Sequence, residues 1–259
     1  MKVNKKVISF IVLVFVLMAY PYYSIITNGI KNSTGWVMLL AMWSPGISAV
    51  IIKLYFDRNI KGFGWEFKNF KLFILSYFIP FFIGLLIYSI AWMTGLGELQ
   101  PLSLLNLILL PTLGVMMSSL FVIGEEIGWR GFLLPEIYRT LSYTKTSFVI
   151  AAIWCIYHYP ILFLGGYHNG TSVWLSFLFF TLSIIGVSFV VTWIRIKSDS
   201  IWPAVLIHSS HNLFFQQYFN PMTVSNSEYT EWFTTEFGAG AAVLYGIAGY
   251  YFWRKRHLL

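Results

Sequence analysis

LFILSYFIPFFIGLLIYSIAWM, residues Leu72–Met93, is the stretch of sequence that decides the fold class. It contains no charged side chain and is close to the ~20 residues that an α-helix needs to cross a bilayer. Similar runs recur along the 259-residue chain, which is 58% hydrophobic and only 10% charged. Soluble domains usually carry about 25% charged residues. We therefore exclude a soluble globular protein and expect an all-α, polytopic membrane protein.

Eight apolar runs divide the chain, and we expect each to form a transmembrane helix. The expected spans are Val7–Ile26, Trp36–Phe56, Leu72–Met93, one within Pro101–Leu134, Ser147–Leu164, Val173–Ile194, Ile201–Phe219 and Phe237–Trp253. The first resembles a signal peptide, but no small-x-small cleavage site follows it, so we count it as a span. We expect a single integral membrane domain over residues 1–259, with a catalytic core at about 101–219.

The basic residues indicate how the chain is oriented. With eight spans, both termini lie on one side of the membrane, together with every Lys and Arg except Lys31. Because cytoplasmic loops are enriched in Lys and Arg, we expect cytoplasmic termini in a multi-pass protein of a bacterial cell membrane. The net charge of +7 is confined to short clusters between apolar runs, so no nucleic-acid partner is expected. The outer loops are expected to hold Glu98, Glu228, Glu231 and Glu236.

The first of three polar clusters is GEEIGWRGFLLP, residues 124–135. Charged groups at membrane depth cost at least ~2.5–3.5 kcal/mol each, which makes such groups functional candidates. On a helix, Glu126 and Arg130 are four residues apart and should form an ion pair, whereas Glu125 points to another face. We therefore expect Glu126 and Arg130 to be supporting residues and Glu125 to be free for chemistry. The alternative is that the fourth span ends at Ile123 and a cytoplasmic loop follows.

The other two clusters contain histidines within apolar runs. The second, WCIYHYP, includes His158, although a single His on an apolar helix is more often a packing residue than a catalyst. The third, HSSHN, places His208 and Asn212 four residues apart and so on one helical face. His211 lies near the same face and is an alternative to His208, but its simpler interpretation is a packing hydrogen bond.

The polar residues of the three clusters share a depth in the membrane. Counted from the cytoplasmic edge at 1.5 Å per residue, Glu125, His158, His208 and Asn212 lie about 10–17 Å deep. Polar residues at that depth normally face the interior of a helix bundle or a water-filled cavity. We therefore expect the four side chains to form a single site.

Together, these residue types fit hydrolysis of a peptide bond. Glu125 is a candidate general base for water, and His158 can hold the same water or protonate the leaving amine. His208 and Asn212 can supply N–H donors to the developing oxyanion. Several His with a Glu also match the ligand types of catalytic zinc. However, the helical signature of two His four apart with an intervening Glu is absent, so we expect no metal and keep zinc as the alternative.

Other nucleophiles are weaker candidates. Ser209 and Ser210 lie beside a His, but no separate acid completes a triad. Cys155 is the only cysteine and lies in an apolar run, so it can form neither an intrachain disulfide nor a cysteine metal cluster.

Three ordered motifs resemble those of the CPBP family of intramembrane glutamic endopeptidases. This family groups type II CAAX prenyl endopeptidases with bacteriocin-processing enzymes. The motifs are Glu125-Glu126-x-x-x-Arg130, an aromatic-x-x-x-His ending at His158, and His208-x-x-x-Asn212. The resemblance extends from about Gly124 to Asn212, whereas the first three spans match only in being apolar.

The resemblance implies an eight-helix fold and a role for each motif. Glu125 and His158 would act on the catalytic water, and His208 and Asn212 would stabilise the oxyanion. Glu126 and Arg130 would be supporting residues. One departure is Trp154, where the family more commonly has Phe, and we expect this to alter the shape of the pocket rather than the chemistry.

The substrate is not indicated by any residue. Eukaryotic members of the family act on prenylated proteins, and many bacterial members are associated with bacteriocin maturation or self-immunity. We expect a membrane-associated peptide or protein substrate and do not assume that it is prenylated. The alternatives are a non-catalytic bacteriocin-immunity or scaffold protein and a transporter whose buried carboxylates carry protons, although no inverted repeat supports the latter.

Overall fold

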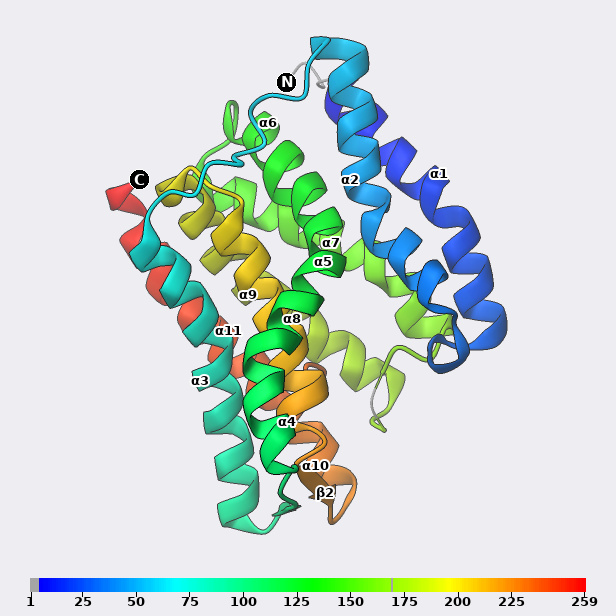
Figure 1. The fold of residues 1–259 in the computed structure, drawn as a ribbon, viewed down its shortest axis with the longest axis vertical. Helices are drawn as coiled ribbons and strands as arrows, with labels where there is room; N and C mark the ends of the chain where they lie inside the picture. Colours follow the sequence, from blue (N-terminus) through cyan, green and yellow to red (C-terminus); the bar gives the residue numbers. More distant parts are fainter. Residues whose placement is uncertain (1–4, 169) are drawn as a thin grey trace.

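The computed structural model describes residues 5–168 and 170–259, which form a bundle of helices (Figure 1). The α-helices are α1 Lys5–Asn28, α2 Gly35–Asp57, α3 Phe70–Thr94, α4 Leu104–Leu109, α5 Val115–Glu126, α6 Leu134–Tyr138, α7 Tyr143–Leu164, α8 Val173–Ser198, α9 Trp202–Asn212, α10 Glu228–Phe233 and α11 Ala239–Arg254. Wider π-helical turns form η2 Leu110–Gly114, η3 Ile127–Leu133 and η4 Leu213–Phe219, and 3-10 turns form η1 Ile30–Asn32 and η5 Lys255–Leu258.

The helices correspond to the expected spans. Six helices of the described residues are long and apolar enough to cross a membrane: α1, α2, α3, the continuous segment Leu104–Tyr138, α7 and α8. The other two expected spans are also helical but shorter, as α9 continued by η4 and as α11. Because Leu104–Tyr138 is helical throughout, the alternative in which a loop follows Ile123 is wrong. The chain is an all-α, multi-pass membrane protein.

Local sequence signals set where several of these helices begin. Ser142 precedes α7 and accepts a hydrogen bond from the backbone N–H of Lys145, and Ser172 caps α8 in the same way. Such side chains satisfy backbone N–H groups that have no partner within the helix. The caps therefore fix the start of the two helices that lie side by side along one flank of the site.

The first polar cluster lies at a close contact between two helices. η3 packs against α2, and a Cβ added to Gly128 would lie only 2.4 Å from the Cβ of Pro45. A larger residue at this position would therefore force the helices apart. Because α5 also packs against α9, the first and third motifs become neighbours inside the bundle.

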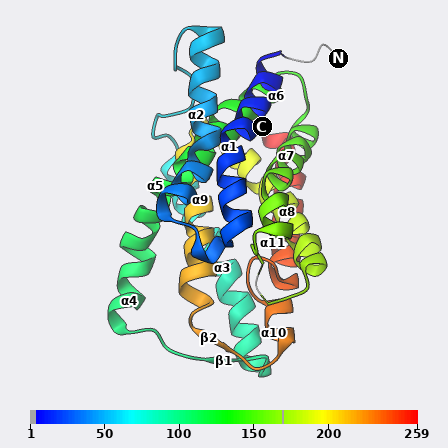
Figure 2. The same ribbon diagram turned by 90° about the vertical axis from the view of Figure 1, so that its right-hand side faces the viewer.

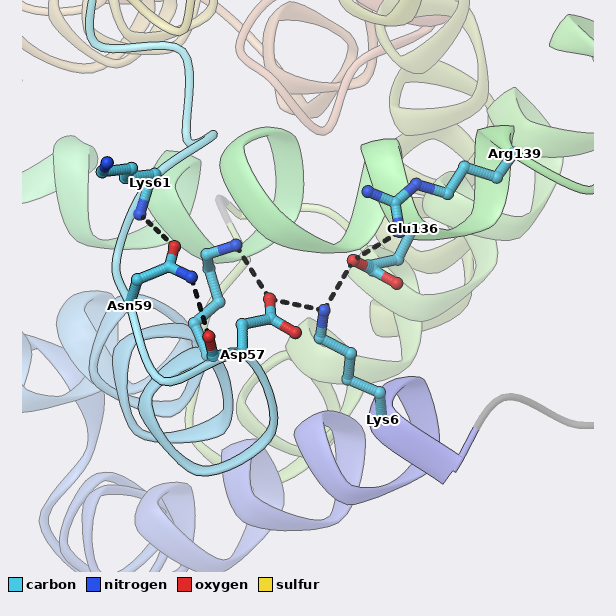
Figure 3. Close-up of polar contacts among 7 residues, drawn as sticks. Lys6, Asp57, Asn59, Lys61, Glu136 and Arg139 are labelled. Atoms are coloured by element: carbon cyan, nitrogen blue, oxygen red, sulfur yellow. Dashed lines mark hydrogen bonds and ion pairs between the residues drawn. The ribbon is translucent and has the colours of Figure 1, made fainter.

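An ion-pair network joins α1, α2 and α6 at one end of the bundle (Figure 3). Nζ of Lys6 lies 2.7 Å from Oδ2 of Asp57 and 2.9 Å from Oε1 of Glu136. Lys53 also pairs with Asp57, and Arg139 with Glu136. The start of α1 and the C-terminus lie toward this same end of the bundle, in line with an even number of spans (Figure 1).

A short antiparallel ribbon closes the opposite end of the bundle (Figure 2). Strand β1, Gly97–Leu99, pairs with β2, Thr223–Ser225, so that Glu98 lies opposite Val224. The ribbon joins the connection between α3 and α4 to the segment that follows η4.

Candidate functional site

A cavity with about 550 Å³ of empty space, including its open mouth, lies inside the bundle. Its polar lining residues are Glu126, Arg130, His158, Tyr167, Ser183, His208, His211, Asn212, Glu236 and Tyr245. Five of the six residues singled out in the motifs thus line one space, although they come from three separate helical segments. The exception is Glu125, which is buried beside the cavity and is not among its lining residues.

Glu125 is held by two tryptophans. Its side chain is 3% exposed, and its Oε2 accepts hydrogen bonds from Nε1 of Trp129 at 3.2 Å and Nε1 of Trp154 at 2.9 Å. Among the described residues, no side chain or backbone group donates to Oε1. Trp154 itself lines the cavity, so one residue contacts both the carboxylate and the open space. Glu125 is therefore held by neutral donors alone.

Glu126 has different partners, as its different helical face predicts. Its Oε1 lies 2.7 Å from Nη1 of Arg130 and 2.8 Å from Nδ1 of His208. The expected ion pair between Glu126 and Arg130 is confirmed, and both side chains are at least 99% buried. Because a carboxylate only accepts hydrogen bonds, Nδ1 of His208 is the donor in this contact.

The Arg130 guanidinium is covered by an aromatic face. Its Cζ lies 4.0 Å from the ring centroid of Trp154. Nε and Nη2 of this arginine have no hydrogen-bond partner among the residues that the structure describes. A cation over an indole face is stabilised by the ring quadrupole, so Trp154 compensates part of the missing hydrogen bonding. Trp154 thus contacts both the free carboxylate of the motif and its arginine.

His158 is fixed by its own helix. Nδ1 lies 2.8 Å from the carbonyl oxygen of Trp154, one turn earlier in α7. A carbonyl oxygen only accepts, so Nδ1 carries the proton, and Nε2 is the acceptor nitrogen of the neutral ring. The ring also stacks near Tyr167, with centroids 6.0 Å apart. His158 is therefore oriented within the cavity wall with a free basic nitrogen.

One π-helical turn begins within the first motif, and another begins directly after the third. η3 begins after Glu126, and η4 begins after Asn212. Such wide turns are rare and occur frequently at functional sites, because they shift the side chains that follow relative to a regular helix. The sequence analysis did not anticipate them.

The sequence analysis also missed Glu236. It was expected in an outer loop with Glu228, but it is 5% exposed and lines the cavity. The only sequence signal is that Glu236 directly precedes the apolar run beginning at Phe237, which does not distinguish a buried carboxylate from an exposed one.

A metal centre has no evident ligand set in the part of the chain that the structure describes. Across residues 5–168 and 170–259, no group of three or more His, Cys, Asp or Glu side chains is arranged to hold a metal ion. His158 and His208 instead make hydrogen bonds through Nδ1 to a carbonyl oxygen and a carboxylate, respectively.

Comparison with known proteins places these motifs in a family. Residues 102–214 match the family model described as type II CAAX prenyl endopeptidase Rce1-like. The match includes all three motifs. Over this segment the chain resembles the CPBP family. It is also 31% identical over 94 residues to the CAAX prenyl protease 2 of Methanococcus maripaludis.

The likeness between this chain and its relative is confined to part of each protein. The aligned region covers 34% of this chain and 34% of the Methanococcus protein, so the chain spans about a third of the length of that curated relative. The residues matched by the family model form most of the cavity wall.

Proposed function

We propose that the protein is an intramembrane endopeptidase that hydrolyses a peptide bond of a membrane-associated peptide or protein. The observation that carries this proposal is the convergence of His158, His208 and Asn212 on one buried cavity, beside the carboxylate of Glu125. The family match over residues 102–214 supports the same reaction class. The name of the Methanococcus relative refers to prenylated substrates, and we propose only the broader class of membrane-anchored substrates here.

In this proposal Glu125 is the general base. Glu126 already neutralises Arg130, whereas Glu125 receives only neutral indole N–H groups. Because Glu125 forms no ion pair, its carboxylate is the one assigned to proton abstraction. Its Oε1 takes a proton from water while the water oxygen bonds to the substrate carbonyl carbon. Nε2 of His158 accepts the second hydrogen of the same water as a hydrogen bond.

The oxyanion is assigned to His208 and Asn212. Nδ1 of His208 donates to Glu126, so Nε2 is a donor only when the imidazole is protonated. The Asn212 amide supplies the second N–H group, and removal of one such donor typically costs ~10²–10³ in rate. Collapse of the tetrahedral intermediate then breaks the C–N bond, and the proton held by Glu125 passes to the leaving amine.

We propose that this reaction requires no metal ion, with zinc as the alternative. Measurement of the metal content of the purified protein, and of activity before and after chelation, separates the two. Loss of activity on chelation, restored by zinc, would establish the alternative.

The test of the endopeptidase proposal is cleavage of a library of membrane-anchored peptides by the purified protein in lipid nanodiscs. Glu125→Gln and His158→Ala should each reduce cleavage by at least ~10². Glu98→Gln is the matched control, because this glutamate is exposed on β1. If both site variants cleave as fast as the parent protein, the assigned residues are wrong. If the parent cleaves nothing while cells carrying Glu125→Gln stay protected from a bacteriocin, the protein is a non-catalytic immunity factor.

A further inference from the structure

Glu236 is a buried carboxylate for which the proposed reaction has no use. It lies between α10 and α11 and lines the same cavity as His158 and His208. Its Oε1 and Oε2 lie 3.1 and 2.9 Å from Nε2 of Gln216, and its Oε2 lies 3.4 Å from Nε2 of His211. The cavity is thus lined by two carboxylates, Glu236 and the glutamate paired with arginine in the first motif.

The charge of Glu236 has no fixed cation beside it. Among the described residues, His211 is the only basic side chain within ion-pair distance. Nδ1 of His211 lies 2.8 Å from the hydroxyl of Tyr245, which can donate to it. The neutral tautomer with its proton on Nε2 therefore satisfies both contacts, and no positive charge is required. In contrast, Glu126 is compensated by the guanidinium of Arg130.

Hydrogen bonds favour the ionised form of Glu236. Burial acts to raise the pKa of its carboxyl, but hydrogen bonds from His211, Gln216 and Tyr167, together with the positive charge that His211 carries when protonated, hold the pKa below its ordinary value. When His211 is neutral, the buried carboxylate has no cationic partner among the described residues, and a cation that enters the cavity would relieve the cost of this charge.

The backbone before Glu236 is held in an unusual conformation. Thr235 has φ of +64°, a region that β-branched residues rarely adopt. Its N–H donates to the hydroxyl of Tyr88 at 3.2 Å. A Cβ added to Gly238 would lie 1.9 Å from the carbonyl oxygen of Thr234, so the turn also requires a glycine at this position. Backbone strain of this kind persists at ligand-binding sites, where it positions a side chain.

The cavity wall suits a long side chain with an apolar stem. α8 contributes Phe180, Ile184 and Val187 from successive turns, and these residues line the cavity together with Glu236. Lysine and arginine side chains place their methylene groups along apolar surface and their charge beside polar groups. The combination of an apolar wall and one uncompensated carboxylate matches this shape and charge.

We propose that Glu236 binds the cationic head of a lysine or arginine side chain of the substrate and so sets a preference for a basic residue near the cleavage site. This inference rests on the proposed endopeptidase function. Glu236 is then a specificity-determining residue, and His211 and Gln216 position its carboxylate.

The first test compares matched membrane-anchored peptides in nanodiscs, with lysine, arginine or norleucine at each position near the cleaved bond. The parent protein should favour lysine or arginine at one position by about ten- to a hundredfold in kcat/KM, the range expected for hydrogen bonds to a charged group. In Glu236→Gln that ratio should fall to near one. Glu228→Gln is the matched control, since this glutamate is exposed in the same outer segment, and it should retain the ratio.

The outcomes separate this inference from the proposed function. Cleavage by the parent with no preference for a basic residue, or with a preference that survives Glu236→Gln, overturns the inference and leaves the endopeptidase proposal intact. If Glu236→Gln does not fold, Glu236→Asp keeps the charge on a shorter side chain and should retain a reduced preference. An undiminished preference for a basic residue in a folded Glu236→Asp variant would contradict recognition by this carboxylate.

A second test needs no peptide cleavage, and uses n-butylammonium as the probe and n-butanol as its neutral match. A ligand that binds only the folded state raises the unfolding temperature. In the parent protein and in Glu228→Gln, n-butylammonium should raise the unfolding temperature more than n-butanol does. In Glu236→Gln the two probes should raise the unfolding temperature equally. An equal shift for both probes in the parent protein, or an undiminished difference in Glu236→Gln, contradicts a cation site at this carboxylate even if no peptide substrate is ever cleaved.

Discussion

The indole N–H of Trp154 donates a 2.9 Å hydrogen bond to Oε2 of Glu125. The face of the same ring lies 4.0 Å from Cζ of Arg130. The sequence analysis expected the exchange of the family's common Phe for Trp to affect only the shape of the pocket. The hydrogen bond shows that this tryptophan also has a polar contact with the carboxylate that we propose as the base.

Trp154→Phe is expected to lower kcat for a membrane-anchored peptide by about tenfold or more, because it removes a hydrogen bond to a charged group. The aromatic face over Arg130 would be kept, so the unfolding temperature should change little. Trp129→Phe removes the longer hydrogen bond, 3.2 Å, and should have the smaller effect on kcat. Equal kcat values for Trp154→Phe and the parent protein would show that this contact does not position the base.

Glu126→Gln is expected to destabilise the protein by ~3–5 kcal/mol, because it leaves the guanidinium of Arg130 buried without a charge partner. The measurement is the denaturant or thermal midpoint of the purified protein in detergent. The double variant Glu126→Gln with Arg130→Met removes both charges and should regain part of the loss. Glu228→Gln serves as the exposed control. A midpoint for Glu126→Gln equal to that of the control would mean that the pair contributes no stability.

The two carboxylates of the ion-pair network in Figure 3, Asp57 and Glu136, should contribute unequally to stability. The Asp57 side chain is 27% exposed, so Asp57→Asn should cost less than ~1 kcal/mol, and less still at high salt. Glu136 is 6% exposed, and Glu136→Gln should cost more and depend less on salt. Thermal midpoints at low and high ionic strength test this order. A larger loss of stability in Asp57→Asn than in Glu136→Gln, or a loss in Glu136→Gln that depends more on salt, would contradict this order.

The expected cytoplasmic position of both termini can be tested by thiol labelling in cells. In a Cys155→Ser background, Glu98→Cys should react with a membrane-impermeant reagent in intact cells, because Glu98 is exposed on the ribbon opposite the C-terminus. Lys61→Cys is also exposed and should react only after the membrane is permeabilised. The reverse labelling pattern would mean that the chain has the opposite orientation.

Much of the fold could be predicted because each span can be recognised from the length of its own apolar run. α3, for example, covers Phe70–Thr94 where Leu72–Met93 was expected, and the charged loops on either side leave little freedom. The ion pair of Glu126 with Arg130 was equally accessible, since it depends only on helical spacing. These predictions needed no knowledge of how the helices pack.

The rest depends on packing between distant segments. The contact of Trp154 with Glu125 follows from how α7 lies against the first motif, which no local pattern encodes. Glu236 is folded inward by a turn whose sequence resembles that of any polar loop. The π-helical turns likewise leave no clear trace in the sequence. The catalytic roles of Glu125, His158, His208 and Asn212 remain predictions.

The wide turn η3 makes the number of residues between the first motif and α6 important, as well as their identity. In a regular helix each residue advances the chain by about 100° around the axis, at 3.6 residues per turn. Loss of a single residue from Ile127–Leu133 that restored regular α-helical winding would therefore swing Glu136 away from Lys6 while leaving Glu125 and Glu126 where they are. A deletion in this segment would thus uncouple the anchoring of α1 from the chemistry.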